Sequence, residues 1–171
     1  VALVNKPNSP LAKEAQFEVP LLAGEEVAVA ATKSYITSLT ALLQFEATYH
    51  DNQELLKALE LLPQRMQEAV EMDWTPAVAQ LHTKRRTMVI ARGYAFPVAL
   101  EMALKFKETS SLQAEAFSSA EVLHGPFALI DKDYTVLVIA QNDATLKGTL
   151  DVVEKITAAK GTVLLALPED I

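Results

Sequence analysis

Three charged residues with helical spacing are the first group in this sequence that could do chemistry. Glu101, Lys105 and Glu108 are four and three residues apart, so in a helix they lie in a row on one face. A carboxylate beside a cation stays ionised when partly desolvated, and it can then accept a proton as a general base. The same spacing also gives ordinary solvent-facing ion pairs, and it does not choose between the two interpretations.

A histidine before a tight turn is the second candidate. His124 is followed by Gly125 and Pro126, two residues that favour a fixed turn. An imidazole near its unperturbed pKa can give or take a proton at physiological pH, which suits acid or base chemistry. The alternative is a turn histidine that bonds only to the backbone.

Strands and helices that alternate along the chain must position these residues. Short runs rich in Val, Ile and Leu predict buried strands, and apolar residues three or four apart predict helices. The predicted buried strands are 1–4, 87–90, 135–140 and 162–167, and 17–22 is a further short strand-like run. The predicted helices are 32–50, 53–72, 97–110 and 144–159. Pro63 predicts that 53–72 is an angled pair of helices. The pattern indicates an α/β fold, a three-layer open sheet of mostly parallel strands with helices on both faces.

The ends of the predicted elements indicate where ligands bind. Asn142 and Asp143 can cap the last helix, and Gly161 can supply its left-handed stop. Ligands of open parallel sheets lie at the carboxyl ends of strands, here the loops after residues 22, 90 and 140. These loops contain neither a Gly-x-Gly-x-x-Gly fingerprint nor a Walker loop, so a dinucleotide or nucleoside triphosphate is disfavoured and no cofactor is expected.

Composition excludes several other classes. The 171 residues carry a net charge of -7 and no cysteine, which disfavours nucleic-acid binding and rules out thiol catalysis. No apolar run is long enough to cross a bilayer, so we expect a soluble, cytoplasmic protein. His50, His82 and His124 are scattered without ligand-spaced carboxylates, and no metal site is expected. We expect one domain over residues 1–171, with 1–30 as a leading segment.

Two stretches together resemble the SIS (sugar isomerase) domain family, which is flavodoxin-like or Rossmann-like in fold. The first runs from Ala91-Arg92-Gly93 through Glu101, Lys105 and Glu108 to His124-Gly125-Pro126 and Ile130. It is similar to the isomerase half of glucosamine-6-phosphate synthase and to stand-alone SIS-type glucosamine-6-phosphate deaminases. The second, Ala23-Gly24-Glu25-Glu26 through Val29 and Ala31 to Thr32-Lys33, resembles that family's Ala-Gly-x-Glu-x-x-Val-Ala-x-Thr-Lys segment.

The resemblance implies aldose–ketose chemistry on a hexose 6-phosphate, with a proton moved between C1 and C2. It implies that Glu108 is the base, that Lys105 is a positioning or proton-relaying cation, and that His124 opens the sugar ring. Such a histidine often comes from the neighbouring subunit, so a homodimer with a shared active site is expected. Val29 matches a position whose backbone contacts the sugar, and Ala31 stands beside it in the same substrate-binding segment.

Departures from the family pattern narrow this expectation. Leu123 stands where a lysine is usual, and Ala31 replaces a common serine, which points away from the synthase itself. The Ser/Thr-rich phosphate loop and the C-terminal lysine segment have no counterpart, so we expect a fragment, the second half of a two-SIS protein. Deamination of glucosamine 6-phosphate is the leading reaction. The alternatives are the synthase isomerase domain, a deglycase, a galactosamine 6-phosphate deaminase and a non-catalytic phosphosugar-binding regulatory module.

Overall fold

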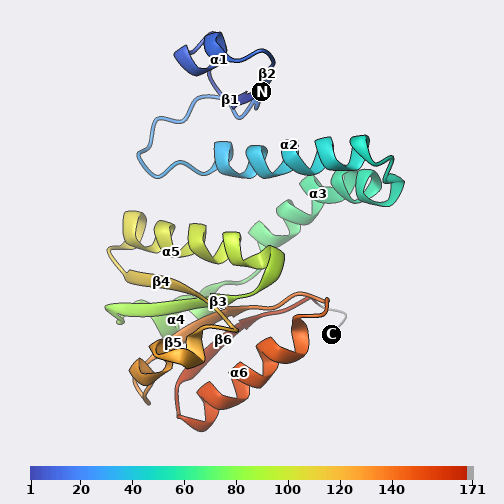
Figure 1. Ribbon diagram of the computed structural model, residues 1–171. Helices are drawn as coiled ribbons and strands as arrows, with labels where there is room; N and C mark the ends of the chain where they lie inside the picture. Colours follow the sequence, from blue (N-terminus) through green and yellow to red (C-terminus); the bar gives the residue numbers. More distant parts are fainter. Residues whose placement is uncertain (169–171) are drawn as a thin grey trace. The chain divides into compact units, whose positions relative to one another are not determined.

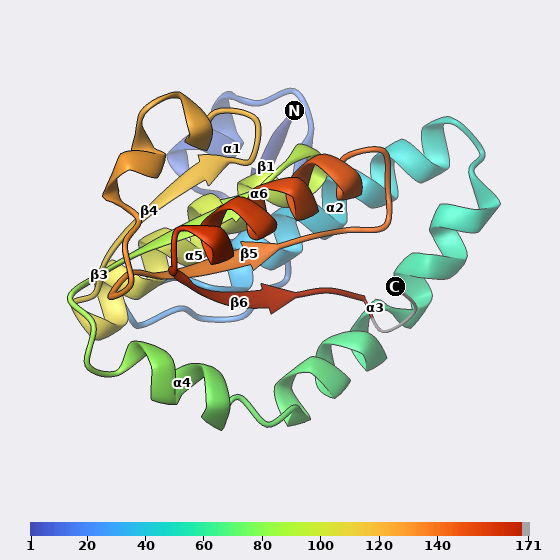
Figure 2. The same cartoon turned by 90° about the horizontal axis from the view of Figure 1, so that it is seen from below.

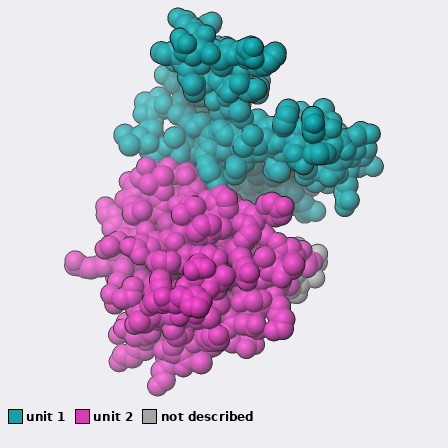
Figure 3. Space-filling view, in the orientation of Figure 1, with its two compact units in different colours: residues 1–73 teal, residues 74–171 magenta. Residues whose placement is uncertain are grey.

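The chain forms two compact units in a computed structural model that describes residues 1–168. The first unit comprises residues 1–73 and the second begins at Trp74 (Figure 3). Residues 169–171 of the expected single domain lie outside the described residues, and the single-domain interpretation stays a prediction. No helix within residues 1–168 has both the length and the apolar character that a membrane crossing requires.

A four-stranded parallel sheet is the centre of the second unit. The strands lie in the order β4-β3-β5-β6, so β3 and β5 are internal. Their bounds are β3 Arg86–Ala91, β4 Gln113–Ser118, β5 Thr135–Ile139 and β6 Thr162–Ala166. In the register of the sheet, Val89 of β3 stands between Ala116 of β4 and Leu137 of β5. Both internal strands were predicted as buried strands, and the structure confirms them.

Helices cover both faces of this sheet, because β3 presents apolar side chains alternately to each. Met88 and Ile90 pack with Ile156 of α6 (Leu146–Ala158) in one core cluster. Val89 packs with Ala99 of α5 (Phe96–Ser110) in a second cluster on the opposite face. Figures 1 and 2 show α5 on one side of the sheet and α6 on the other. The predicted three-layer α/β architecture is therefore confirmed.

Strand β4 and several short elements were not predicted. β4 lies at the sheet edge, where Gln113 and Glu115 are exposed and alternate with buried or half-buried alanines, so it lacks the continuous apolar run of an internal strand. The unpredicted helical elements are α1 Pro10–Glu14, α4 Thr75–Leu81, η1 Gly93–Ala95, η2 Val122–His124 and η3 Pro126–Leu129. Each is too short to show a periodic pattern.

The first unit holds a small sheet and two long helices. Strands β1 (Ala2–Val4) and β2 (Glu18–Pro20) pair with each other in parallel and form a sheet of their own. Helix α2 (Lys33–Tyr49) agrees with its prediction, whereas α3 (Gln53–Glu71) is one continuous helix with Pro63 inside it. The expected angled pair is wrong. Proline removes one backbone hydrogen bond, and the hydrogen-bonded turns on either side of Pro63 continue the helix.

The boundaries of α6 differ in part from the sequence expectation. The N-cap residue is Thr145, which makes no side-chain capping bond, so the expected cap by Asn142 or Asp143 is wrong. Asp143 instead fixes the turn before the helix, since its Oδ1 accepts hydrogen bonds from the N–H of Thr145 at 2.7 Å and from its hydroxyl at 2.6 Å. The left-handed stop falls on Lys160, with φ 67°, and Gly161 is not in that region. Gly161 is needed for space instead, because a Cβ there would lie 2.8 Å from Cγ2 of Ile130 and 2.9 Å from Cγ2 of Ile156.

Candidate functional site

Helix α5 carries the charged row that the sequence predicted. Its buried face is made by Ala99 and Ala103, which pack toward the sheet and leave the charged face on another side. Lys105 Nζ lies 3.3 Å from Oε1 of Glu101 and 2.5 Å from Oε2 of Glu108. The three side chains are only 20–25% exposed, which is low for charged groups on a helix. The structure therefore brings Lys105 and both carboxylates together in one partly desolvated row.

The charges in this row stabilise one another. The hydrogen bond to Glu108 raises the pKa of Lys105 above its ordinary value, desolvation opposes this, and Glu101 adds to the increase. Lys105 is therefore an ammonium at neutral pH, and two carboxylates share its charge. A cation held between two bases can orient a proton acceptor and can stabilise an oxyanion that develops nearby.

His124 ends the short helix η2 and is exposed. Its backbone N–H donates to the carbonyl of Glu121 at 2.9 Å, and Gly125 after it has φ 143°, a conformation that favours glycine. Within residues 1–168 the imidazole makes no hydrogen bond or ion pair with the charged row of α5. The turn is thus fixed through its backbone, and the side chain is left accessible.

Glu108 and His124 lie at opposite ends of the edge strand β4, next to opposite faces of the sheet. Glu108 comes just before β4 starts, and His124 follows the end of β4, so a strand about 17 Å long lies between the two residues. Val122, next to His124, packs in the core cluster of α6, whereas α5 covers the other face (Figure 1). One chain does not bring this pair together.

Val29 and Ala31 belong to the first unit, in the segment that leads into α2. Val29 is 95% exposed, and Ala31 is half-buried. The N–H of Ala31 donates to the carbonyl of Val29 at 2.9 Å, which gives a tight turn. The structure therefore presents the backbone of this segment to solvent, as a backbone contact with a ligand requires.

Glu26 holds this segment, a role that the sequence analysis missed. Its Oε1 accepts hydrogen bonds from the N–H groups of Thr32 at 2.7 Å and Lys33 at 2.8 Å, and Oε2 accepts one from Ser34 at 3.2 Å. The Ser34 side chain and these N–H groups lower the pKa of Glu26 to about 2. A helix cap six residues ahead of the N-cap position is outside the usual capping-box spacing, so no local signal marked it.

The carboxyl edge of the large sheet is occupied by the chain's own groups. A Cβ on Gly93 would lie 3.2 Å from Nε2 of Gln141, so the loops after β3 and β5 are in close contact there. Asp143 lies just before α6, and its hydrogen bonds to Thr145 lower its pKa. A phosphate at this helix start would meet an ionised carboxylate. The loops after residues 90 and 140, which the sequence favoured for ligands, are therefore poorly suited to hold a phosphate.

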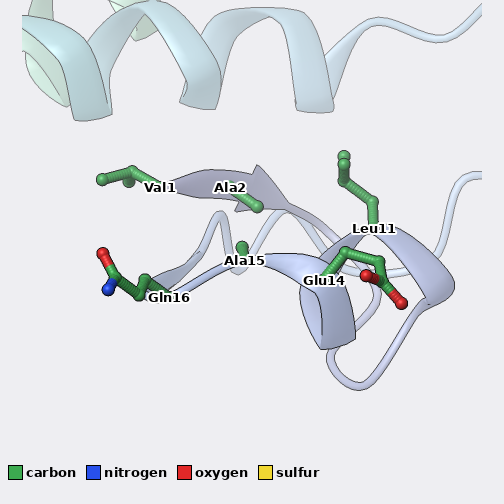
Figure 4. A pocket seen from close by; sticks show the side chains of 6 residues that line it. All are labelled: Val1, Ala2, Leu11, Glu14, Ala15 and Gln16. Carbon is green, nitrogen blue, oxygen red and sulfur yellow. The ribbon is translucent and has the colours of Figure 1, made fainter.

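One hollow of about 460 Å³ lies beside α1 and β1 in the first unit (Figure 4). It is lined by Val1, Ala2, Leu11, Glu14, Ala15 and Gln16, none of which is a predicted site residue. Among residues 1–168 no three His, Asp or Glu side chains are grouped as metal ligands. The charged row of α5, the turn at His124 and the segment before α2 thus remain the candidate site elements.

Comparison with known proteins assigns the chain to a family. The family model of the SIS domain matches residues 80–167, just over half of the chain, which include α5 and the His124 turn. The chain belongs to the SIS domain family. This membership agrees with the parallel sheet, the two helix layers and the motif from Arg92 to Pro126.

Several relatives cover almost the whole of the SIS chain. Glutamine–fructose-6-phosphate aminotransferase [isomerizing] from Bradyrhizobium diazoefficiens is 34% identical over 176 residues, which cover 96% of this chain and 29% of that protein. The C-terminal domain of glucosamine-fructose-6-phosphate aminotransferase from Francisella tularensis has a TM-score of 0.84 at 32% identity, covering 97% of this chain and 50% of that one.

A more distant structure shares the SIS fold alone. Glucosamine-6-phosphate deaminase from Thermotoga maritima has a TM-score of 0.76 at 22% identity, covering 98% of this chain and 51% of that one. The SIS chain spans less than a third of the length of the curated relatives it matches and about half of the solved chains. It is related to the isomerase half of the aminotransferase.

Proposed function

We propose that the chain is part of an enzyme that converts glucosamine 6-phosphate and water to fructose 6-phosphate and ammonia. The single observation that carries this is the row on α5, in which Lys105 contacts Glu101 and Glu108 within 3.3 Å in a partly desolvated setting. Membership of the SIS family supports an isomerase-type reaction on a phosphosugar.

The residues divide the reaction between them. His124 opens the ring by moving a proton from the C1 hydroxyl to the ring oxygen. Glu108 takes the acidic C2 proton next to the aldehyde, and the resulting enolamine is reprotonated at C1. Lys105 orients Glu108 and stabilises the oxyanion at C1. Water then hydrolyses the C2 imine and releases ammonia.

We further propose that the active site is shared between two copies in a homodimer. The positions of Glu108 and His124 at opposite ends of β4 support this, because one chain cannot place both on one sugar. A twofold dimer brings the His124 of one subunit to the Glu108 of the other. The family resemblance implies a further contact with the sugar by the backbone at Val29, with Ala31 beside it in the segment before α2.

The reaction is tested with the full-length protein and glucosamine 6-phosphate, by measuring ammonia and fructose 6-phosphate. We expect turnover by the wild type and a loss of about 100-fold or more in Glu108→Gln. Glu154→Gln, an exposed helix position in α6, is the matched control and should keep wild-type activity. The absence of ammonia release from the wild type refutes the proposed reaction. Equal turnover in Glu108→Gln refutes the proposed base.

An active site shared between two subunits is tested by combining two inactive variants in one dimer. Glu108→Gln and His124→Asn, coexpressed, give heterodimers in which one of the two sites has both native residues. Random pairing then restores about a quarter of wild-type activity. If each chain carries a complete site, the mixture stays as inactive as the parents. A monomer by light scattering with full activity also contradicts the proposal.

The second candidate function is the isomerase part of a glutamine–fructose-6-phosphate aminotransferase. Sequence identity favours it, because the relatives at 34% and 32% identity carry that activity in their names. The same Glu108 and Lys105 would serve it. Fructose 6-phosphate with glutamine is the discriminating substrate pair. Glucosamine 6-phosphate formed from that pair, without deamination in the absence of glutamine, would select this candidate over the first.

A further inference from the structure

The segment from Ala23 to Ser34 is held at both ends and exposed in the middle. At its start Asn5 accepts a hydrogen bond from the N–H of Ala23 at 2.9 Å and donates one to the carbonyl of Gly24 at 2.6 Å. At its end the carboxylate of Glu26 accepts three backbone hydrogen bonds from residues 32–34. Residues 27–31 thus form a closed loop between Glu26 and α2.

This loop, residues 27–31, contributes little to its own rigidity. Val27 and Val29 are 87% and 95% exposed, so no core packing restrains them. Within the described residues the main chain of the loop makes one hydrogen bond, from Ala31 to Val29. A loop with so few contacts samples many conformations unless its ends are fixed. Its conformation therefore depends on the residues that close it.

Glu26 closes loop 27–31 at the start of α2, and the negative charge of its carboxylate strengthens the hydrogen bonds that do so. The N-cap residue Thr32 makes no side-chain capping bond. Among the side chains of residues 1–168, the carboxylate of Glu26 is therefore the one that satisfies the first N–H groups of α2. An anion at the start of a helix is stabilised by the helix dipole, and charge-assisted hydrogen bonds are stronger than neutral ones. A glutamine at 26 would lose the charge and turn an NH₂ group toward N–H donors.

We propose that Glu26 is a positioning residue for substrate binding, which fixes loop 27–31 so that the backbone at Val29 is ready to contact the sugar phosphate. The inference rests on the proposed function, which places Val29 in the substrate site. A preformed loop lowers the ordering cost of binding and leaves the proton transfer at Glu108 unaffected. The loss of Glu26 is therefore expected to change KM and Kd much more than kcat.

The test compares Glu26→Gln with Glu25→Gln in the full-length protein. Glu25 is the adjacent exposed glutamate, and its backbone carbonyl accepts a hydrogen bond from Lys33 Nζ at 2.8 Å. We expect Glu26→Gln to raise KM for glucosamine 6-phosphate by at least about 10-fold with kcat within about 3-fold of the wild type. Glu25→Gln should keep both constants within about 2-fold.

Calorimetry with glucosamine 6-phosphate separates failure of the inference from failure of the proposed function. The titrations use Glu108→Gln protein, in which turnover is expected to be slower by about 100-fold or more. They compare Glu108→Gln alone with two double variants, which add Glu25→Gln or Glu26→Gln. Equal Kd values for the two double variants overturn the role of Glu26 alone. Binding by a wild type that releases no ammonia removes the proposed reaction but leaves the inference. No binding by the wild type overturns both.

A folding defect is distinguished by two further measurements. The urea midpoint of Glu26→Gln shows whether the protein is folded when KM is measured. If Glu26→Gln does not fold, Ser34→Ala replaces it, because it removes only the side-chain hydrogen bond from Ser34 to the carboxylate. A raised KM with unchanged kcat in Ser34→Ala supports the proposal, and an unchanged KM overturns it.

Discussion

Replacing Gly161 by alanine tests the packing between α6 and β6. Gly161 does not have a positive φ, so an alanine meets no backbone strain. Its Cβ would instead lie 2.8 Å from Cγ2 of Ile130 and 2.9 Å from Cγ2 of Ile156. These methyl groups belong to buried, β-branched side chains of the α6 core cluster and cannot simply rotate away.

The size of the effect follows from this overlap. Carbon atoms in contact prefer about 3.5–4.0 Å, so the core must shift by more than half an ångström to admit the new methyl group. Overpacking of this kind costs about 1–3 kcal/mol. In a protein of this size the expected decrease in Tm is roughly 2–12 °C.

Gly148→Ala is the matched control for the assay. Gly148 lies inside α6, and its added Cβ would be 3.4 Å from Nη1 of Arg92, an exposed side chain that can move. Alanine is the better helix former, so this variant should gain about 0.5–1 kcal/mol. Urea and thermal unfolding followed by circular dichroism measure both variants. If Gly161→Ala is as stable as the wild type, the packing explanation for this glycine is refuted.

Three further predictions use the same unfolding measurements. Ile156→Ala leaves a cavity in the α6 core and should cost about 2–5 kcal/mol, whereas a change below 1 kcal/mol would contradict full burial of Ile156. The pKa of Glu26 falls from 4.5 to about 2 on folding, so its contribution to stability is complete above pH 4.5 and is lost toward pH 2. The urea midpoints of the wild type and Glu26→Gln should therefore converge as the pH falls over that range. A constant difference between the midpoints would contradict the lowered pKa of Glu26. Folding raises the pKa of Lys105 above 10.5, so its contribution to stability is present below pH 10.5 and is lost above the raised pKa. The urea midpoints of the wild type and Lys105→Gln should therefore converge only in strong alkali.

Much of the fold was predictable because the spacing of apolar residues along the chain indicates which segments are buried. The internal strands β3 and β5 are continuous apolar runs, and α6 repeats apolar residues three or four apart. The edge strand β4 escaped prediction because two of its six residues, Gln113 and Glu115, are polar and exposed and interrupt the apolar run. Pro63 misled the prediction for α3, since a proline inside a helix removes one backbone hydrogen bond without ending a helix whose other turns are intact.

The candidate site was predictable only within single elements. The contact of Lys105 with Glu101 and Glu108 follows from helical spacing alone, and the structure shows it. The roles proposed for these residues, for His124 and for Val29 come from the family resemblance. Glu26 escaped notice because it reaches the start of α2 across a loop whose path no local pattern describes.

The sequence by itself determined which residues share a helix face, which runs are buried, and that the chain belongs with the SIS domains. Only the tertiary structure decided that Glu108 and His124 lie at opposite ends of β4, and that Gly161 is needed for packing and not for ending the helix. The reason is physical. Contacts within an element repeat every few residues, whereas the distance between elements depends on strand order, connections and the packing of side chains far apart in the chain.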